Sequence, residues 1–235
     1  MTKRKAQLIV ALDVDTFDEA KGLIDALGDD VEIFKVGSQL FTAYGPDVVR
    51  HLLKAGKKVF LDLKFHDIPN TVANAVRAAV SLREGDQSIF MCTMHTAGGK
   101  EMLERASAEA TKAAHSAGVK RPLLLGITAL TSDEKKDSIG QFVLEKALLA
   151  KEAGLDGVVA SSQEAALVRE NLGQDFIIVT PGIRPEGTQA GDQKRVTTPS
   201  EAVAQGSDFL VVGRPIVKAE DPSQAAKQIL EEMGK

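Results

Sequence analysis

The chain has 235 residues, of which 43% are hydrophobic and 26% charged, and its formal net charge at pH 7 is −4. This composition is typical of a globular protein with one large or two small domains, and it gives no support for a nucleic-acid-binding surface. The apolar run before Asp13 is too short for a signal peptide or a membrane span. The single cysteine, Cys92, lies in an apolar run and is expected to be a buried hydrophobic residue. One cysteine cannot form a disulfide within the chain, and together with the short N-terminal apolar run this leads us to expect a cytoplasmic protein with no membrane partner.

Short apolar, β-prone segments alternate with amphipathic segments along the whole chain. Strands are expected at residues 7–14, 31–37, 59–64, 88–94, 122–128, 157–161, 176–183 and 209–213. Helices are expected at 17–27, 47–55, 70–80, 100–114, 142–153, 163–172, 199–204 and 221–233. Eight such units without a linker predict one α/β domain over residues 1–235, a (β/α)8 TIM barrel. An open doubly wound sheet is the alternative, but the chain lacks the Gly-x-Gly-x-x-Gly turn and the Walker loop of many such sheets.

The expected third strand carries charges where it ends. Alternation places Phe60, Asp62 and Lys64 on one face, and Asp67 follows in the loop, which gives an Asp-x-Lys-x-x-Asp pattern. Charges this close together are costly to remove from water unless they pair. A structural ion pair at the barrel rim is therefore an alternative to a catalytic site.

Other polar residues fall at the corresponding ends of other expected strands. The full set is Asp13, Lys35, Asp62, Lys64, Asp67, Thr131, Arg184 and Arg214. Barrel active sites gather at the C-terminal ends of the strands. This convergence favours an active site over a rim ion pair for the group as a whole.

The loops after the seventh and eighth expected strands suit a phosphate group. Arg184 and Gln193 lie in one loop, and Gly213 and Arg214 in the other. Gly213 permits close approach of the backbone, and the Arg214 guanidinium offers a fork of donors. The polar loop 184–193 is long enough to close over a ligand as a lid, although a plain surface loop would have a similar composition.

The four histidines are dispersed without the spacing of metal ligands, so we expect no metal site. Lys64 could form a Schiff base with a carbonyl substrate. The two flanking aspartates instead favour an ammonium group that donates a proton.

A resemblance to the bacterial orotidine 5′-phosphate decarboxylase family is carried by LDLKFHDIPNTV (61–72), ALDV (11–14), VTPGIRPEG (179–187), AGDQKRV (190–196) and VVGRP (211–215). It extends from the first expected strand to the last. The resemblance implies a cofactor-free barrel enzyme that decarboxylates orotidine 5′-monophosphate to uridine 5′-monophosphate, the last step of UMP synthesis. Metal-dependent barrels that act on sugar phosphates share Asp-x-Lys-x-x-Asp but usually follow it differently.

The resemblance also implies roles for individual residues. Lys64 would donate a proton to C6 of the pyrimidine, and Asp62 would lie beside the substrate carboxylate. Lys35 and Asp67 would complete an alternating charge network, with Asp67 and Thr71 reaching the site from the partner subunit of a homodimer.

The remaining implied residues bind the nucleotide. Asp13 and Lys35 would contact the ribose, and Thr131 the pyrimidine edge. The implied phosphate ligands are Gln193, Gly213 and Arg214, with Arg184 near the lid.

Two other functions compete with this one. The first is a metal-dependent sugar-phosphate lyase on the same barrel. The second is a catalytically silent sensor of a phosphoribosyl ligand, which would need the phosphate-binding residues but not the charge network.

Overall fold

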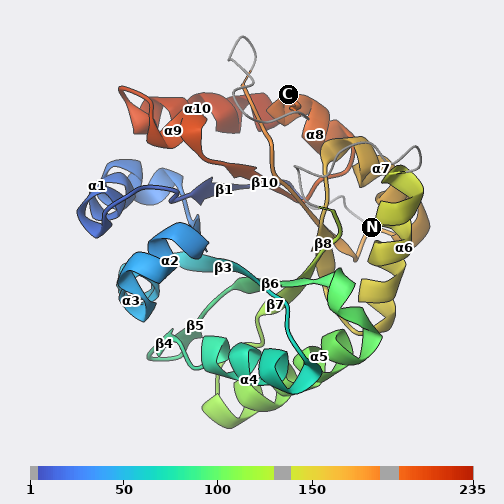
Figure 1. Ribbon diagram of the computed structural model, residues 1–235. Helices are drawn as coiled ribbons and strands as arrows, with labels where there is room; N and C mark the ends of the chain where they lie inside the picture. The colour runs from blue at the N-terminus through green and yellow to red at the C-terminus, as the bar shows by residue number, and fades with distance from the viewer. Residues whose placement is uncertain (1–4, 130–138, 186–195, 235) are drawn as a thin grey trace.

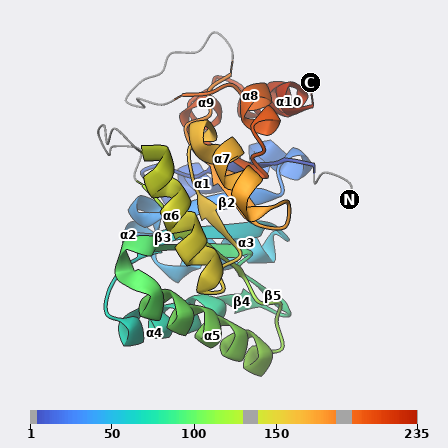
Figure 2. The ribbon, with the colours of Figure 1, turned by 90° about the vertical axis from the view of Figure 1, so that its right-hand side faces the viewer.

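A computed structural model describes residues 5–129, 139–185 and 196–234 of the chain. Eight parallel strands close into a barrel in the order β1-β10-β9-β8-β7-β6-β3-β2. Figure 1 shows the strands at the centre with helices around them, and Figure 2 shows the same arrangement from the side. The predicted (β/α)8 barrel is confirmed, and the open doubly wound alternative is excluded.

The elements follow the predicted alternation. The barrel strands are β1 (Gln7–Ala11), β2 (Ile33–Gly37), β3 (Lys58–Phe65), β6 (Met91–His95), β7 (Leu123–Ile127), β8 (Gly157–Val159), β9 (Ile177–Thr180) and β10 (Phe209–Val212). The helices are α1 (Phe17–Leu27), α2 (Ser38–Tyr44), α3 (Pro46–Lys54), α4 (Pro69–Val80), α5 (Gly99–Ala117), α6 (Ile139–Glu152), α7 (Ser162–Leu172), α8 (Pro199–Ala204), α9 (Arg214–Val217) and α10 (Pro222–Met233). Within the described ranges, no helix is long and apolar enough to cross a bilayer.

Local sequence explains where several helices begin. Thr16 and Glu19 form a reciprocal capping box at the start of α1. Thr198 and Glu201 form the same arrangement at the start of α8. Five helices have proline in the first turn, where the missing N–H has no partner within the helix.

The structure differs from the sequence-based expectations mainly at element ends and in small additions. Helices α2 and α9 were not expected. A hairpin of β4 (Arg83–Glu84) and β5 (Gln87–Ser88) occupies the region before the fourth barrel strand, which begins at Met91 rather than at residue 88. Strand β9 ends at Thr180 because the next residue, Pro181, has no N–H for the ladder.

Side chains alternate between the inside of the barrel and the surrounding helices. The inner cluster consists of Ile9, Ile33, Phe60, Met91, Leu125, Ile177, Val179 and Phe209. The residues two positions after Ile33, Phe60 and Met91 therefore face inward as well, one layer closer to the C-terminal end of the barrel. Those residues are polar, and they build the candidate site.

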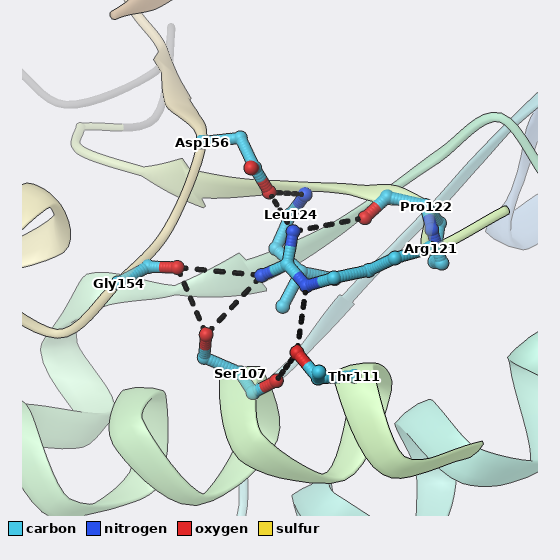
Figure 3. A network of polar contacts seen from close by, with 7 residues as sticks. All are labelled: Ser107, Thr111, Arg121, Pro122, Leu124, Gly154 and Asp156. Carbon is cyan, nitrogen blue, oxygen red and sulfur yellow. Dashed lines mark hydrogen bonds and ion pairs between the residues drawn. The ribbon is translucent and has the colours of Figure 1, made fainter. Parts of the chain in front are cut away.

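An arginine–aspartate pair lies at the opposite, N-terminal end of the barrel. The Nη1 of Arg121 lies 2.6 Å from the Oδ2 of Asp156, and this oxygen also accepts from the Leu124 N–H at 2.7 Å. The Arg121 guanidinium further donates to the Gly154 carbonyl and the Ser107 hydroxyl (Figure 3). The pair thereby joins the start of β7 to the segment that leads into β8.

A second pair repeats this arrangement before β10. The Nη2 of Arg169 lies 2.6 Å from the Oδ2 of Asp208, which accepts from the Ile178 N–H at 2.8 Å. The same Nη2 donates to the Gly206 carbonyl at 2.8 Å. In both pairs a Gly-x-Asp segment enters a strand and is bonded to the backbone of the preceding strand. Because barrel active sites lie at the other end, we interpret both pairs as stabilising the fold.

Candidate active site

Strand β3 departs from regular extended geometry at Lys64, whose φ angle is 52°. Lys64 is the one non-glycine residue with a positive φ in the described ranges. The register with β6 shifts at this place. Leu61 pairs with Cys92, and Phe65, four residues later, pairs with Met94, which is only two residues after Cys92. Left-handed backbone is unfavourable for a residue with a Cβ, and such strain is concentrated at functional sites.

Four of the predicted residues form a network of alternating charge. The Nζ of Lys35 lies 2.9 Å from the Oδ1 of Asp13 and 3.8 Å from the Oδ2 of Asp62. The Nζ of Lys64 lies 2.8 Å from the same Oδ2 of Asp62. The side chains of Lys35 and Asp62 are 11% and 12% exposed, whereas that of Lys64 is 38% exposed. In the order Asp13–Lys35–Asp62–Lys64, the two inner charges are therefore buried and the two outer charges are partly exposed.

The Asp62 carboxylate is held on both oxygens. Its Oδ2 faces the two ammonium groups of Lys35 and Lys64, and its Oδ1 accepts a hydrogen bond from the Thr93 hydroxyl at 2.9 Å. A buried carboxylate needs this degree of pairing because an unpaired charge in a low-dielectric site is costly. Each charge in the network thus has an oppositely charged neighbour within 3.8 Å.

The sequence analysis missed two residues of this site. Thr93 of β6 is fully buried and touches both Asp62 and the Lys64 backbone. Its position could have been found, because it follows Met91 by two residues just as Asp62 follows Phe60.

Gly37 is the second missed residue. A Cβ at this position would lie 2.9 Å from the Nζ of Lys35 and 3.2 Å from the Oδ1 of Asp13. Any larger residue would therefore push against the Lys35–Asp13 ion pair. Gly37 pairs with Asp62 in the β2–β3 register, which places it beside the network.

A cavity of about 870 Å³ opens beside the network. Its lining includes five residues that were predicted for the site: Asp13, Lys35, Arg184, Gly213 and Arg214. The cavity lies over the C-terminal ends of β1, β2, β9 and β10. Asp62 and Lys64 are not part of its lining, and Lys35 connects them to it.

The two arginines approach this cavity differently. Arg184 is buried, and its Nη1 donates to the Ile183 carbonyl at 2.8 Å. Arg214 is exposed and begins α9 directly after Gly213. One arginine is therefore buried and bonded to the backbone just after β9, and the other is exposed at the start of α9.

Asp67 and Thr71 lie apart from the network. Both are exposed, and the Asp67 carboxylate accepts from the Ile68 N–H at 2.6 Å. Within the described part of the chain, Asp67 forms no ion pair with Lys35 or Lys64. Ile68, which lies between them in the sequence, is a large apolar side chain that is 67% exposed.

The other predicted features are partly outside the described residues. Thr131, Gln193 and most of the loop 184–193 fall there. Among the described residues, no group of three His, Cys, Asp or Glu side chains is arranged to hold a metal ion. Burial raises the pKa of the Cys92 thiol to about 12, so this residue is a protonated core side chain rather than a nucleophile.

Fold and site together define a (β/α)8-barrel protein with its candidate active centre at the C-terminal ends of the strands. The sequence model of the orotidine 5′-phosphate decarboxylase / HUMPS family matches residues 6–229. The chain therefore belongs to this family.

Named relatives match over nearly the whole length. The orotidine 5′-phosphate decarboxylase of Vibrio cholerae is 46% identical, and the alignment covers 95% of this chain and 96% of the relative. That of Syntrophotalea carbinolica is 48% identical, with 99% and 97% covered. The crystal structure of orotidine 5′-phosphate decarboxylase from Lactobacillus acidophilus superposes with a TM-score of 0.83 at 39% identity and covers 98% of this chain and 100% of that one.

Proposed function

We infer that this chain decarboxylates orotidine 5′-monophosphate to uridine 5′-monophosphate in pyrimidine biosynthesis. Family membership and relatives of that name over nearly the full length support the reaction. The observation that carries the assignment to this site is the Lys35–Asp62–Lys64 network at the ends of β2 and β3. Its geometry is suited to a reaction that develops negative charge at one carbon.

Lys64 is the proposed proton donor. When the C6–carboxylate bond breaks, its electron pair stays on C6 and CO₂ leaves. An ammonium beside C6 stabilises charge that exists only in the transition state, which is how an enzyme raises its rate. The Lys64 ammonium then gives its proton to C6, and solvent returns a proton to the amine. Lys64 is the more exposed lysine of the network, with 38% of its side chain exposed against 11% for Lys35.

Asp62 is the proposed neighbour of the substrate carboxylate. Its contact of 2.8 Å with the Nζ of Lys64 supports a role in positioning the proton donor. A carboxylate in this place would also repel the substrate carboxylate before CO₂ leaves. Lys35 lies between Asp62 and Asp13 and forms an ion pair with each of them.

The nucleotide is proposed to occupy the cavity beside the network. Asp13 and Lys35 would bind the ribose hydroxyls, and Gly213 and Arg214 would bind the phosphate, with Arg184 near the lid. All five line the cavity, which supports this placement. Thr131 and Gln193 remain predicted contacts to the pyrimidine edge and the phosphate. Binding energy from the phosphate, far from C6, can order the site for the reaction.

A homodimer is part of the proposal, with Asp67 and Thr71 serving the site of the partner subunit. Both side chains are exposed, and Ile68 adds an exposed apolar residue between them. A cytoplasmic location also remains a prediction, which cell fractionation tests.

Mixed dimers test the exchange of Asp67 directly. Lys64→Ala and Asp67→Asn homodimers should both be nearly inactive. A dimer with one subunit of each kind has one site with an intact Lys64 and an intact partner Asp67, so activity should reappear on mixing. Failure of mixing to restore activity, with heterodimers demonstrated, would show that Asp67 acts within its own subunit.

The reaction itself is tested by the ultraviolet absorbance change of orotidine 5′-monophosphate with the purified protein, with and without a chelator. We expect rapid conversion that the chelator does not affect. Binding without conversion would support the sensor function. Conversion of sugar phosphates that is lost with the chelator would support the metal-dependent lyase.

A further inference from the structure

We propose that Thr93 is a positioning residue that sets the geometry of the acid–ammonium pair Asp62–Lys64. The proposal rests on the proposed function of this pair. It is carried by two hydrogen bonds of one buried hydroxyl and by the irregular backbone that this hydroxyl faces.

Thr93 lies opposite the irregular part of β3. Leu61 pairs with Cys92, and Phe65 pairs with Met94, so three residues of β3 lie opposite Thr93 alone. In this stretch the regular ladder between the strands is interrupted, and backbone N–H groups need other acceptors. The Lys64 N–H donates to the Thr93 Oγ1 at 2.9 Å, so a side chain replaces the missing backbone partner.

The same hydroxyl also binds the catalytic carboxylate. A carboxylate can only accept, so the Thr93 hydroxyl donates its proton to the Asp62 Oδ1, at 2.9 Å, while its oxygen accepts from Lys64. Both functions of the hydroxyl are thus used, and Thr93 is 0% exposed, so water does not compete. Its methyl group and β-branching limit the side-chain rotamers and hold the hydroxyl in place.

These two bonds fix the position of the Lys64 backbone relative to the Asp62 carboxylate. Lys64 has a left-handed backbone with φ of 52°, which its surroundings must hold in place. Thr93 ties that backbone to the carboxylate that contacts the Lys64 ammonium. Loss of the hydroxyl would release the strain at Lys64 and free one carboxylate oxygen, and the Nζ would lose its fixed direction.

Kinetics of matched variants test the proposal. Thr93→Val keeps the shape of the side chain and removes both hydrogen bonds, whereas Thr93→Ser keeps the hydroxyl. Thr180→Val is the control, because Thr180 is also fully buried on a barrel strand but bonds to Ser207. Each variant is assayed for kcat and KM with orotidine 5′-monophosphate.

We expect Thr93→Val to lower kcat by roughly 10- to 100-fold, which corresponds to hydrogen bonds to charged groups. KM should stay within about threefold, because the nucleotide contacts are elsewhere. Thr93→Ser and Thr180→Val should keep kcat within about threefold of the wild type. A kcat of Thr93→Val equal to that of the wild type would overturn the proposal. A kcat of Thr93→Ser as low as that of Thr93→Val would overturn it as well.

A measurement on the backbone separates this proposal from the proposed function. Hydrogen exchange at the Lys64 amide should be slow in the wild type and in Thr93→Ser, and faster in Thr93→Val. It needs no substrate, so it tests the geometry even if the wild type does not turn over the nucleotide. If Thr93→Val does not fold, the wild type still decides, because rapid exchange at Lys64 there would overturn the proposal.

Discussion

The Nζ of Lys64 lies 2.8 Å from the Oδ2 of Asp62, two residues earlier on the same strand. In a regular strand these side chains would share a face, and here they meet although Lys64 has a left-handed backbone. The contact joins the proposed proton donor directly to the carboxylate. Substitutions in either member should therefore affect turnover more than nucleotide binding.

Asp62→Asn tests the carboxylate. The change leaves the ammonium groups of Lys35 and Lys64 without the charge between them. We expect kcat to fall by about 10²-fold or more, since one preorganised charged group is removed from the site. Asp18→Asn is the matched control, because Asp18 forms a surface ion pair with Lys21 on the same helix, away from the network. Equal activity of the two variants in the absorbance assay would contradict the network.

Gly37→Ala tests the close approach of Lys35 to the backbone. The new Cβ would lie 2.9 Å from the Lys35 Nζ and should displace it from Asp13. We expect KM to rise by about tenfold or more, because these two residues are the proposed ribose ligands. Gly140→Ala, in α6, has only an ordinary contact at 3.5 Å to Leu167 and should leave KM unchanged. Unchanged KM in Gly37→Ala would contradict the arrangement.

The two arginine–aspartate pairs at the N-terminal end of the barrel should affect stability and not activity. Arg169 and Asp208 have side chains 10% and 7% exposed, against 25% and 28% for Arg121 and Asp156. Arg169→Met should therefore lower the free energy of unfolding by roughly 3–5 kcal/mol, and Arg121→Met by less, because more buried charges lose more when unpaired. Urea unfolding measures both. The reverse order, or a lower kcat in the folded variants, would contradict this interpretation.

Cys92 should be inert in the folded protein. Burial raises the pKa of its thiol from 9.0 to about 12, so at neutral pH the reactive thiolate is absent. A thiol reagent should modify the protein only after denaturation. Because the folded pKa is raised, the contribution of Cys92 to stability is present below pH 9.0 and is lost as the pH rises toward 12. Unfolding of the wild type and Cys92→Ala at alkaline pH measures this difference, and rapid labelling of the native protein would contradict it.

The fold was predictable because hydrophobic periodicity and helix-start signals agree along the chain. Thr16 and Glu19, for example, mark the start of α1 in the sequence and form its capping box in the structure. Element ends were less predictable, because short helices such as α9 depend on tertiary packing rather than on local pattern.

The candidate site was predictable where it followed strand parity. Parity placed Asp62 inward, and the end of β2 placed Lys35 beside it. The positive φ of Lys64 was not visible in the sequence, because lysine has no preference for that conformation. Thr93 was missed because a threonine in an apolar strand is usually read as a core residue, and only the pairing of β3 with β6 brings it to Asp62.

The central claim is that Lys64 donates the proton to C6, and Lys64→Ala tests it most directly. Turnover of orotidine 5′-monophosphate and binding of uridine 5′-monophosphate are measured on the same preparation. We expect turnover to fall by at least about 10⁴-fold, because both the proton donor and the stabilising charge are lost, while the nucleotide still binds. Substantial residual turnover by Lys64→Ala would contradict the account.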